Sequence, residues 1–253
     1  MKSILIVLSI LVSTATIVLG QSGELRDDQK QSVQKLINLF KAKNKTKIAD
    51  MVSYPLRREY PLRDVKNKNN FIQRFDELFD KAIIDQIAKS KISDWSEVGW
   101  RGITLGNGTI WVDDDGNIIA VNYQSAKEKI LLAAAIKADK SQLPASLQNF
   151  KNPVYLIFTK NYKIRIDETA DGVYRYAAWK IKNRKTLPDI VIENGTWEFQ
   201  GSGGNHTVTF TNNGYTYIVS VFVINAADEP DASIEVIQQE KAILTEDGRI
   251  IRN

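Results

Sequence analysis

The sequence holds few of the side chains that enzymes use as nucleophiles or bases. It contains no cysteine, and His206 is its one histidine. Serine and cysteine nucleophiles need a partner base, which is usually a histidine, and zinc sites draw on nitrogen and sulfur ligands. His206 stands in an expected strand beside a glycine-rich loop, which is the position of an incidental strand residue. We therefore predict no catalytic residue of this kind, no metal site and no cofactor.

A run of three aspartates, Asp113 to Asp115, precedes Gly116 and raises the question of calcium binding. An EF-hand loop carries glycine at its sixth position and glutamate at its twelfth. Counting back from Gly116 puts Trp111 at the first position, where the loop needs an acidic ligand, so the pattern does not match. Aspartate and glycine are also the residues that favour tight turns. We expect a turn between two strands here.

A glycine-rich loop is formed by Gly201, Ser202, Gly203, Gly204 and Asn205. Such a loop can cradle an anion, because the backbone N–H groups around glycine are accessible. A phosphate-binding loop normally leads into a helix, whereas the residues that follow here are expected to form a strand. The pattern favours a wide turn or a bulge, which can still serve as an adaptable contact loop for another molecule.

Aromatic residues in the first half are the class that best fits a small-molecule site. Core packing accounts for most aromatic side chains, but they also wall ligand pockets. Arg101 adds a candidate anion-binding group, and the nearest carboxylates for acid–base chemistry are Asp94 and Glu97. The candidate ligand-binding residues are Tyr54, Trp95, Trp100, Arg101 and Trp111.

The elements that must position these residues are helices and a small sheet. Apolar residues recur at helical spacing after residue 24, as Val33, Leu36, Ile37 and Phe40, and this stripe predicts an amphipathic helix. The segment 54–66 has two Tyr-Pro-Leu units and is expected to form an irregular hairpin. The expected helices are 24–43, 47–53, 67–89 (one helix or a broken pair, capped by Asn67) and 126–140, and the expected strands are 98–104, 109–112 and 118–123.

The second half of the sequence is expected to be almost entirely β. Short runs rich in β-branched and aromatic residues alternate with glycine-containing turn signals. This spacing favours a small sandwich or barrel. The expected strands are 154–159, 162–167, 173–181, 190–192, 196–200, 206–211, 215–224 and 233–238, with a last hairpin near 241–251; the turn signals include Asn194-Gly195 and Asp247-Gly248. We predict two domains, 24–140 and 151–253, joined by a linker at 141–150.

Bulk composition excludes some classes of protein. The 34 Lys and Arg residues nearly balance the 30 Asp and Glu residues, whereas nucleic-acid binding needs basic residues gathered on one face. Hydrophobic residues make up 43% of the chain and charged residues 25%, which is typical of globular proteins. Without cysteine, stability must come from packed cores rather than from disulfides. We expect no nucleic-acid partner.

The first 20 residues have the order of a secretory signal peptide. Lys2 supplies a positive start, an apolar run follows, and Val18 and Gly20 are the small or permissive residues before a cleavage site ahead of Gln21. The alternative, an uncleaved anchor helix, is disfavoured because serine and threonine interrupt the run and polar residues follow at once. We expect an exported protein of the periplasm or the extracellular space, with no further membrane span.

Two stretches carry resemblances to known families. The segments SYPL, KNKNNFIQRFDELFDKAI and WSEVGWRGITLGNGTIWVDDDGNIIAVN, between 53 and 122, resemble exported bacterial NTF2-like (SnoaL-like, cystatin-related) domains. The resemblance implies a cone of helices packed on a curved antiparallel sheet around a pocket. The segment WEFQGSGGNHTVTF resembles the Ser-Gly loop of exported lysozyme-inhibitor barrels, although this chain lacks their cysteines.

These observations predict an α+β protein with an NTF2-like cone followed by an all-β domain. We expect an exported, non-catalytic binding or scaffold protein whose partner is a small molecule or another exported macromolecule. Two alternatives stay open, since one fold hosts many functions. One is a small-molecule enzyme that uses a carboxylate in the NTF2-like pocket. The other is an inhibitor or recognition protein that acts through the loop from Gly201 to Asn205.

Overall fold

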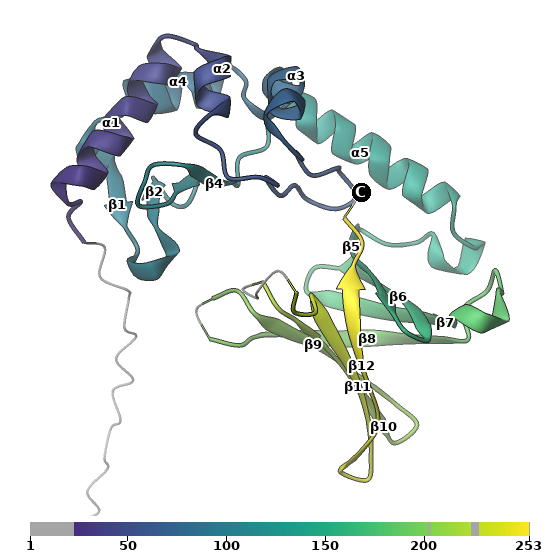
Figure 1. The fold of residues 1–253 in the computed structure, drawn as a ribbon. Coiled ribbons are helices and arrows are strands. Elements are labelled where there is room, and N and C mark those ends of the chain that lie inside the picture. Colours follow the sequence, from purple (N-terminus) through teal and green to yellow (C-terminus); the bar gives the residue numbers. More distant parts are fainter. Residues whose placement is uncertain (1–22, 202, 224–227, 253) are drawn as a thin grey trace, which may run out of the picture.

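The computed structural model describes residues 23–201, 203–223 and 228–252 of the chain (Figure 1). Its first part combines helices with a four-stranded antiparallel sheet, and its second part is a closed barrel of eight antiparallel strands. The prediction of an α+β protein is therefore confirmed, and the barrel is the form that the β-rich half takes. The predicted signal peptide, residues 1–20, lies outside the described residues.

The helices of the first part follow the predicted apolar spacing. The α-helices of the chain are α1 (Asp27–Lys41), α2 (Lys45–Ala49), α3 (Lys68–Leu78), α4 (Lys81–Lys89) and α5 (Ala126–Ser141). Helix α1 buries the predicted stripe from Val33 to Phe40. The Asn67 side chain accepts a hydrogen bond from the backbone N–H of Asn70 and caps α3, as predicted. The 67–89 segment is a broken pair because Asp80 starts a second helix by accepting from the N–H groups of Ala82 and Ile83.

The sheet of the first part is a simple antiparallel meander. Its strands are β1 (Trp95–Glu97), β2 (Ile103–Leu105), β3 (Ile110–Val112) and β4 (Ile118–Val121), hydrogen-bonded in that order. The expected strand over 98–104 is wrong in extent, because a 3₁₀ turn at Gly99–Arg101 interrupts it. Gly102 then adopts a φ of 94°, and a Cβ atom there would lie 2.4 Å from the carbonyl oxygen of Val112. Only glycine lets the chain rejoin the sheet at this point.

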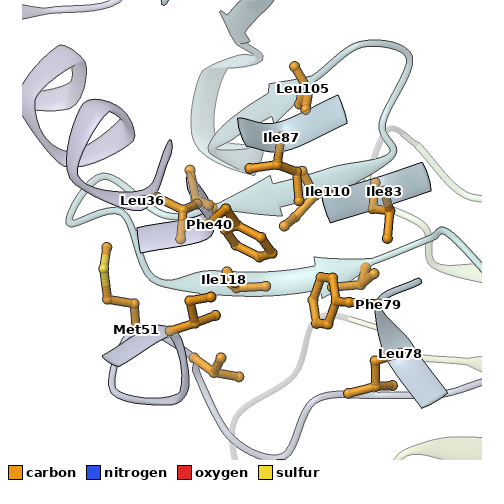
Figure 2. Close-up of a cluster of buried hydrophobic side chains, with 14 of the residues drawn as sticks. Leu36, Phe40, Met51, Leu78, Phe79, Ile83, Ile87, Leu105, Ile110 and Ile118 are labelled. Carbon is orange, nitrogen blue, oxygen red and sulfur yellow. The ribbon is translucent and has the colours of Figure 1, made fainter. Parts of the chain in front are cut away.

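Buried hydrophobic side chains fill the space between these helices and the sheet. Figure 2 shows Phe40 from α1 and Phe79, between α3 and α4, pointing toward Ile110 and Ile118 of the sheet. The rings of Phe40 and Phe79 have their centroids 5.4 Å apart, and Phe71 and Phe75 continue the cluster. Each of these phenylalanines is at most 2% exposed. The irregular 54–66 segment closes over the core as the predicted hairpin, through an antiparallel bridge between Leu56 and Val65.

Helix α5 connects the two parts and is anchored at its ends. At its start, the buried carboxylate of Glu128 pairs with Arg58 at 2.5 Å. At its end, Asp139 pairs with Arg165 of the barrel at 2.5 Å. The stretch 141–150, expected to be a linker, includes a 3₁₀ turn at Ala145–Leu147 and buries Leu147 and Phe150. Figure 1 shows α5 running from the helices toward the barrel.

The barrel is built from eight strands that pair in chain order. They are β5 (Asn152–Thr159), β6 (Tyr162–Ala170), β7 (Val173–Lys180), β8 (Ile190–Phe199), β9 (His206–Asn212), β10 (Tyr215–Val221), β11 (Ala232–Gln238) and β12 (Lys241–Ile250). The barrel closes where β12 pairs with β5, through Gly248 with Thr159 and Ile250 with Ile157. Side chains alternate between the interior and the outer face along each strand.

Two predicted turns are wrong. Asn194-Gly195 lies inside β8, which runs without a break over the two strands expected at 190–192 and 196–200. Asp247-Gly248 lies inside β12, so the expected hairpin over 241–251 is one strand. Both glycines instead make room for neighbours: a Cβ atom on Gly195 would lie 2.1 Å from the ring of Phe210, and one on Gly248 would lie 2.7 Å from Ile157. At both positions, packing in the barrel interior outweighs the local preference of the sequence for a turn.

No helix in the described part of the chain is both long enough and apolar enough to cross a membrane.

Candidate ligand-binding site

The barrel interior has a packed middle and two different ends. Ile157, Ile164 and Val208 are fully buried at the middle, and Phe210 occupies the space that Gly195 leaves free. An eight-stranded barrel has an interior that side chains can fill or that can hold one small ligand. One end carries tyrosines, and the other carries a stack that contains His206. The ends are therefore the places where the described barrel offers room for a ligand.

The tyrosine-lined end contains a pocket of about 420 Å³. Strand alternation brings its wall residues to the inner face of β6, β7, β8, β10, β11 and β12. This volume lies within the usual range for small-molecule sites, and so does a wall made mostly of apolar and aromatic side chains. The pocket is lined by Tyr162, Tyr176, Ala178, Lys180, Asp189, Ile190, Tyr215, Tyr217, Ile234, Val236, Ile243 and Leu244.

Tyr176 lies at the inner limit of this pocket. Its side chain is only 3% exposed, and its ring packs against Phe210 and Tyr217 at centroid distances of 5.5 and 5.6 Å. Its hydroxyl has no hydrogen-bond partner among the described residues. Among the described residues, the buried side-chain atoms that lack both a partner and contact with solvent are Arg175 Nε and Trp197 Nε1. The Tyr176 hydroxyl is not among them. The Tyr176 hydroxyl is therefore accessible from the pocket that the ring lines.

The tyrosine hydroxyls of this pocket stay protonated at neutral pH. Burial raises the pKa of Tyr176 far above its ordinary value, and the neighbouring Tyr217 and Tyr162 raise it further. Burial likewise raises the pKa of Tyr217. A protonated phenol can donate one hydrogen bond and accept others. The inner end of the pocket can therefore donate a hydrogen bond to a ligand oxygen without a charge.

The rim of the pocket is shaped by a bulge and by charged residues. Ile243 is the extra residue where the β11–β12 pairing shifts, and it is 53% exposed at the pocket edge. A bulge re-aims a side chain in this way. The Asp189 carboxylate accepts hydrogen bonds from Lys185 Nζ and from the backbone N–H of Lys180. These bonds lower the pKa of Asp189 to about 2, so it carries a negative charge at neutral pH.

The opposite end of the barrel holds the single histidine in an aromatic stack. The His206 ring lies on Trp197 with centroids 3.7 Å apart, and its Nε2 is 2.9 Å from the Tyr155 hydroxyl. His206 is 3% exposed and belongs to the packing of this end. A second pocket of about 370 Å³ lies between this end and the 58–64 segment, with Tyr155 and Trp197 among its wall residues. It is more polar in character, with Glu168 and Arg252 at its walls.

The aromatic residues proposed from the sequence do not meet in one pocket. Tyr54 packs edge-on against Phe71, and its hydroxyl donates to the carbonyl of Ala49. Trp95 is buried, and its position on β1 pairs with Leu105 on the core face of the sheet. Trp111 pairs with Thr104 and lies on the opposite face, because neighbouring residues of a strand alternate.

The remaining two candidates are Arg101, which lies near Trp111 on that outer face, and Trp100, which is exposed to solvent. Arg101 stacks over the Trp111 ring at 5.9 Å, which is a cation–π contact at an exposed site. Trp100 is 66% exposed. None of these five residues lines either of the two pockets described above.

The acidic candidates of the first part have structural partners. The Asp94 carboxylate accepts from the backbone N–H of Lys91. Glu97 accepts from Arg26 and from Gln29, both at 3.0 Å. In the aspartate run, Asp113 accepts from the backbone and the side chain of Asn117, which confirms the expected turn between β3 and β4. These carboxylates therefore hold the ends of elements in place.

The glycine-rich loop forms the connection between β8 and β9. At its base the backbone N–H of Gln200 donates to the carbonyl of Asn205. Asn205 also accepts from the backbone N–H of Val223, which fastens the loop to the β10–β11 connection. Gly201, Gly203 and Gly204 are described, whereas Ser202 lies outside the described residues. Exposed Phe199 and Val223 flank the loop.

The pocket tyrosines were missed in the sequence analysis, although a signal for them was present. Tyr174 and Tyr176, and likewise Tyr215 and Tyr217, alternate with other residues at the period of a strand, which places each pair on one face. That period does not tell which face is interior or which end a residue reaches. Only the closed strand order brings Tyr162 of β6, Tyr176 of β7 and Tyr217 of β10 to one pocket.

Comparison of this chain with protein-family models, with curated proteins and with solved structures finds no match in any of the three.

Proposed function

We propose that this is an exported, non-catalytic binding protein that holds a small, largely apolar molecule at the tyrosine-lined end of its barrel. The carrying observation is the Tyr176 hydroxyl, which is deep, protonated and without a partner among the described residues. Because this hydroxyl can be reached from the pocket, it is available to bond to a molecule that enters there. A ligand oxygen at the inner limit of the pocket supplies that bond.

The wall chemistry supports binding rather than turnover. The pocket combines aliphatic side chains with tyrosines, and Asp189 at its rim is already bonded to Lys185 and to the backbone. General acid–base catalysis needs a group whose pKa lies near the working pH. The pKa of Asp189 is about 2, and burial moves the pKa of Tyr176 in the opposite direction. Neither group is suited to exchange protons with a substrate at neutral pH.

The helices and sheet of the first part serve, in this proposal, as an NTF2-like scaffold for the barrel. Helices packed on an antiparallel meander support that assignment. The space beneath the helices is filled by the packed phenylalanine cluster, and this favours a scaffold role over a ligand-binding role for the first part. The alternative of an enzyme in this half lacks support, because Asp94 and Glu97 are both engaged by the backbone or by other side chains.

The test is binding of phenylnaphthylamine, an uncharged aromatic probe that fluoresces in apolar surroundings. The wild type is expected to bind one equivalent. Leu244→Trp, at the half-buried wall of the pocket, is expected to weaken binding at least about tenfold, because the indole fills the space. Val191→Trp is the matched control, since Val191 of the same barrel lies on the outer face and is 40% exposed. Equal binding by both variants would contradict the proposed site.

A single-atom change tests the role of Tyr176. Prodan, a naphthalene that carries a ketone oxygen, is expected to accept a hydrogen bond from the Tyr176 hydroxyl. Tyr176→Phe should weaken prodan binding about fivefold, the equivalent of one hydrogen bond worth ~1 kcal/mol. The same variant should bind phenylnaphthylamine as the wild type does, because that probe has no oxygen. A parallel loss for both probes would mean that the variant alters packing rather than a hydrogen bond.

A further inference from the structure

A smaller pocket adjoins the tyrosine-lined pocket and has a different chemistry. It has a volume of about 290 Å³ and is lined by Lys160, Asn161, Tyr162, Lys180, Ile181 and Lys182. Tyr162 and Lys180 line both pockets, so the two spaces meet across these side chains. The smaller pocket lies between the β5–β6 turn and the end of β7. Lys160 lies in the β5–β6 connection, Lys180 is the last residue of β7, and Lys182 lies in the β7–β8 connection.

Among the residues that the structure describes, none of the three lysines forms an ion pair with a carboxylate. Within the described part of the chain, no carboxylate oxygen lies within 4.0 Å of the ammonium groups of Lys160, Lys180 or Lys182. The two acidic groups nearest this pocket, Asp189 and Glu246, already accept hydrogen bonds. Burial acts to raise the pKa of Glu246, but its hydrogen bonds and the charge of Lys160 lower it. Asp189 bonds to Lys185 at 2.8 Å, and Glu246 accepts from the side chain of Asn161 at 2.6 Å.

This arrangement is suited to an anion. Like charges that share a small pocket repel one another, and a bound anion removes that repulsion. Clefts lined by one sign of charge also raise the local concentration of the opposite ion. Because the neighbouring pocket is apolar, the two together match a molecule with an anionic head at one end and an apolar body.

We propose that the ligand is an anionic amphiphile, with its apolar body in the tyrosine-lined pocket and its carboxylate or phosphate head against Lys160, Lys180 and Lys182. The inference rests on the proposed function, because it assigns the body of the ligand to the same pocket. Charge-assisted hydrogen bonds from ammonium groups to such a head are stronger than neutral ones. They also make binding sensitive to salt.

The experiment compares two probes with the same ring skeleton. Anilinonaphthalene sulfonate carries a negative charge, and phenylnaphthylamine carries none. The wild type is expected to bind the sulfonate at least about tenfold more tightly, and added salt should narrow the difference. The double variant Lys160→Gln and Lys182→Gln should lose most of that preference and keep its affinity for phenylnaphthylamine within about twofold, because neither residue lines the tyrosine-lined pocket.

The matched control carries two exposed lysines of α5 changed in the same way, Lys127→Gln and Lys137→Gln. It alters the net charge equally and should retain the preference for the sulfonate. If both double variants lose the preference, or neither does, the lysine pocket is not the head site and this inference is overturned. If the uncharged probe fails to bind the wild type or binds Leu244→Trp equally, the proposed function itself fails.

The head group is then identified by displacement of the bound sulfonate probe. A fatty carboxylate and an alkyl phosphate of equal chain length are compared with the alcohol of that length. Stronger displacement by either anion supports the proposal and names the head group. Equal displacement by the alcohol would overturn it, because the charge would then contribute nothing.

Discussion

At the scale of single residues, His206 shows how one side chain closes an end of the barrel. A backbone carbonyl can only accept, so the 2.7 Å contact from Nδ1 to the Gly204 oxygen places the proton on Nδ1. Nε2 is then free to accept from the Tyr155 hydroxyl. Burial raises the pKa of Tyr155 to about 12, so it remains a donor. The neutral imidazole satisfies both contacts, whereas a protonated one would have to donate to the Tyr155 oxygen and would place a charge in the packed end of the barrel.

This geometry predicts a pH dependence of stability. Burial lowers the pKa of His206 below its ordinary value, although its bond to Gly204 acts in the other direction. The unfolded chain, with a histidine pKa near 6.5, therefore binds a proton at a pH where the folded chain does not. Its contribution to the free energy of unfolding is intact above about pH 6.5 and declines as the pH falls below it.

Urea unfolding of the wild type and of His206→Gln, between about pH 7.5 and pH 5.5, measures this effect, since most carboxylates titrate lower. The wild type should lose stability across this range, and the variant should show a flatter profile. Identical slopes for the two proteins would exclude His206 as the titrating group.

The roles of residues that act on their own sequence neighbours could be predicted from the sequence. The roles that depend on the strand order could not. Asn67 and Ser125 cap helices through their own neighbours in sequence, so the sequence indicates them directly. Tyr176 lines a site because the strand order brings β6, β10 and β11 around it. That information is distributed over almost the whole second half of the chain, and a local pattern does not contain it.

At the scale of elements, β8 depends on a glycine that looks like a turn in the sequence. Gly195 pairs with Tyr174 across the sheet, and the Phe210 ring occupies the place of its absent side chain. Asn194 before it has a φ of 63°, which asparagine tolerates better than most residues. The sequence predicted two strands and a turn here, since Asn-Gly is the strongest local hairpin signal. Closure of the barrel around Phe210 outweighs that preference.

Gly195→Ala is therefore expected to destabilise the protein by about 1–3 kcal/mol, the range for overpacking a core. Chemical denaturation measures the change. Gly23→Ala is a suitable comparison, because the new Cβ atom would approach no neighbour closer than 3.5 Å. Combining Gly195→Ala with Phe210→Leu should cost less than the sum of the single changes, since the smaller side chain gives way. Simple additivity would show that the two positions do not compete for space.

At the scale of the whole molecule, a network of buried charges joins helix α5 to the outer face of the barrel. Arg165 bonds to Asp139 of the helix and to Asp167, while Arg175 bonds to Asp167 and to the carbonyl of Leu147. The Phe150 ring lies beneath both guanidinium groups, at 4.9 Å from that of Arg165. Arg165 and Asp167 are almost completely buried, so each depends on its partners for compensation.

Asp139→Asn should weaken this connection by about 2 kcal/mol, because hydrogen bonds to charged groups contribute more than neutral ones. The wild type is expected to unfold in one transition, seen alike by tryptophan fluorescence and by circular dichroism. In the variant the two signals should separate as the barrel and the helical part unfold independently.

Asp171→Asn provides the control, since Asp171 forms an exposed ion pair with Lys151 whose loss should leave stability almost unchanged. Coincident transitions in Asp139→Asn would show that other contacts carry the coupling.

The length of helix α5 also sets the distance between the two halves of the molecule. Its carboxylates at Glu128 and Asp139 are fixed to opposite parts of the molecule, and of its own residues only Glu128 is fully buried. Each added residue would lengthen the helix by 1.5 Å and swing its far end through about 100°. Two extra residues would turn Asp139 away from Arg165, whereas seven would return it to nearly the same direction. Chains built on this plan can thus grow at this point only by lengths close to a whole number of helical turns.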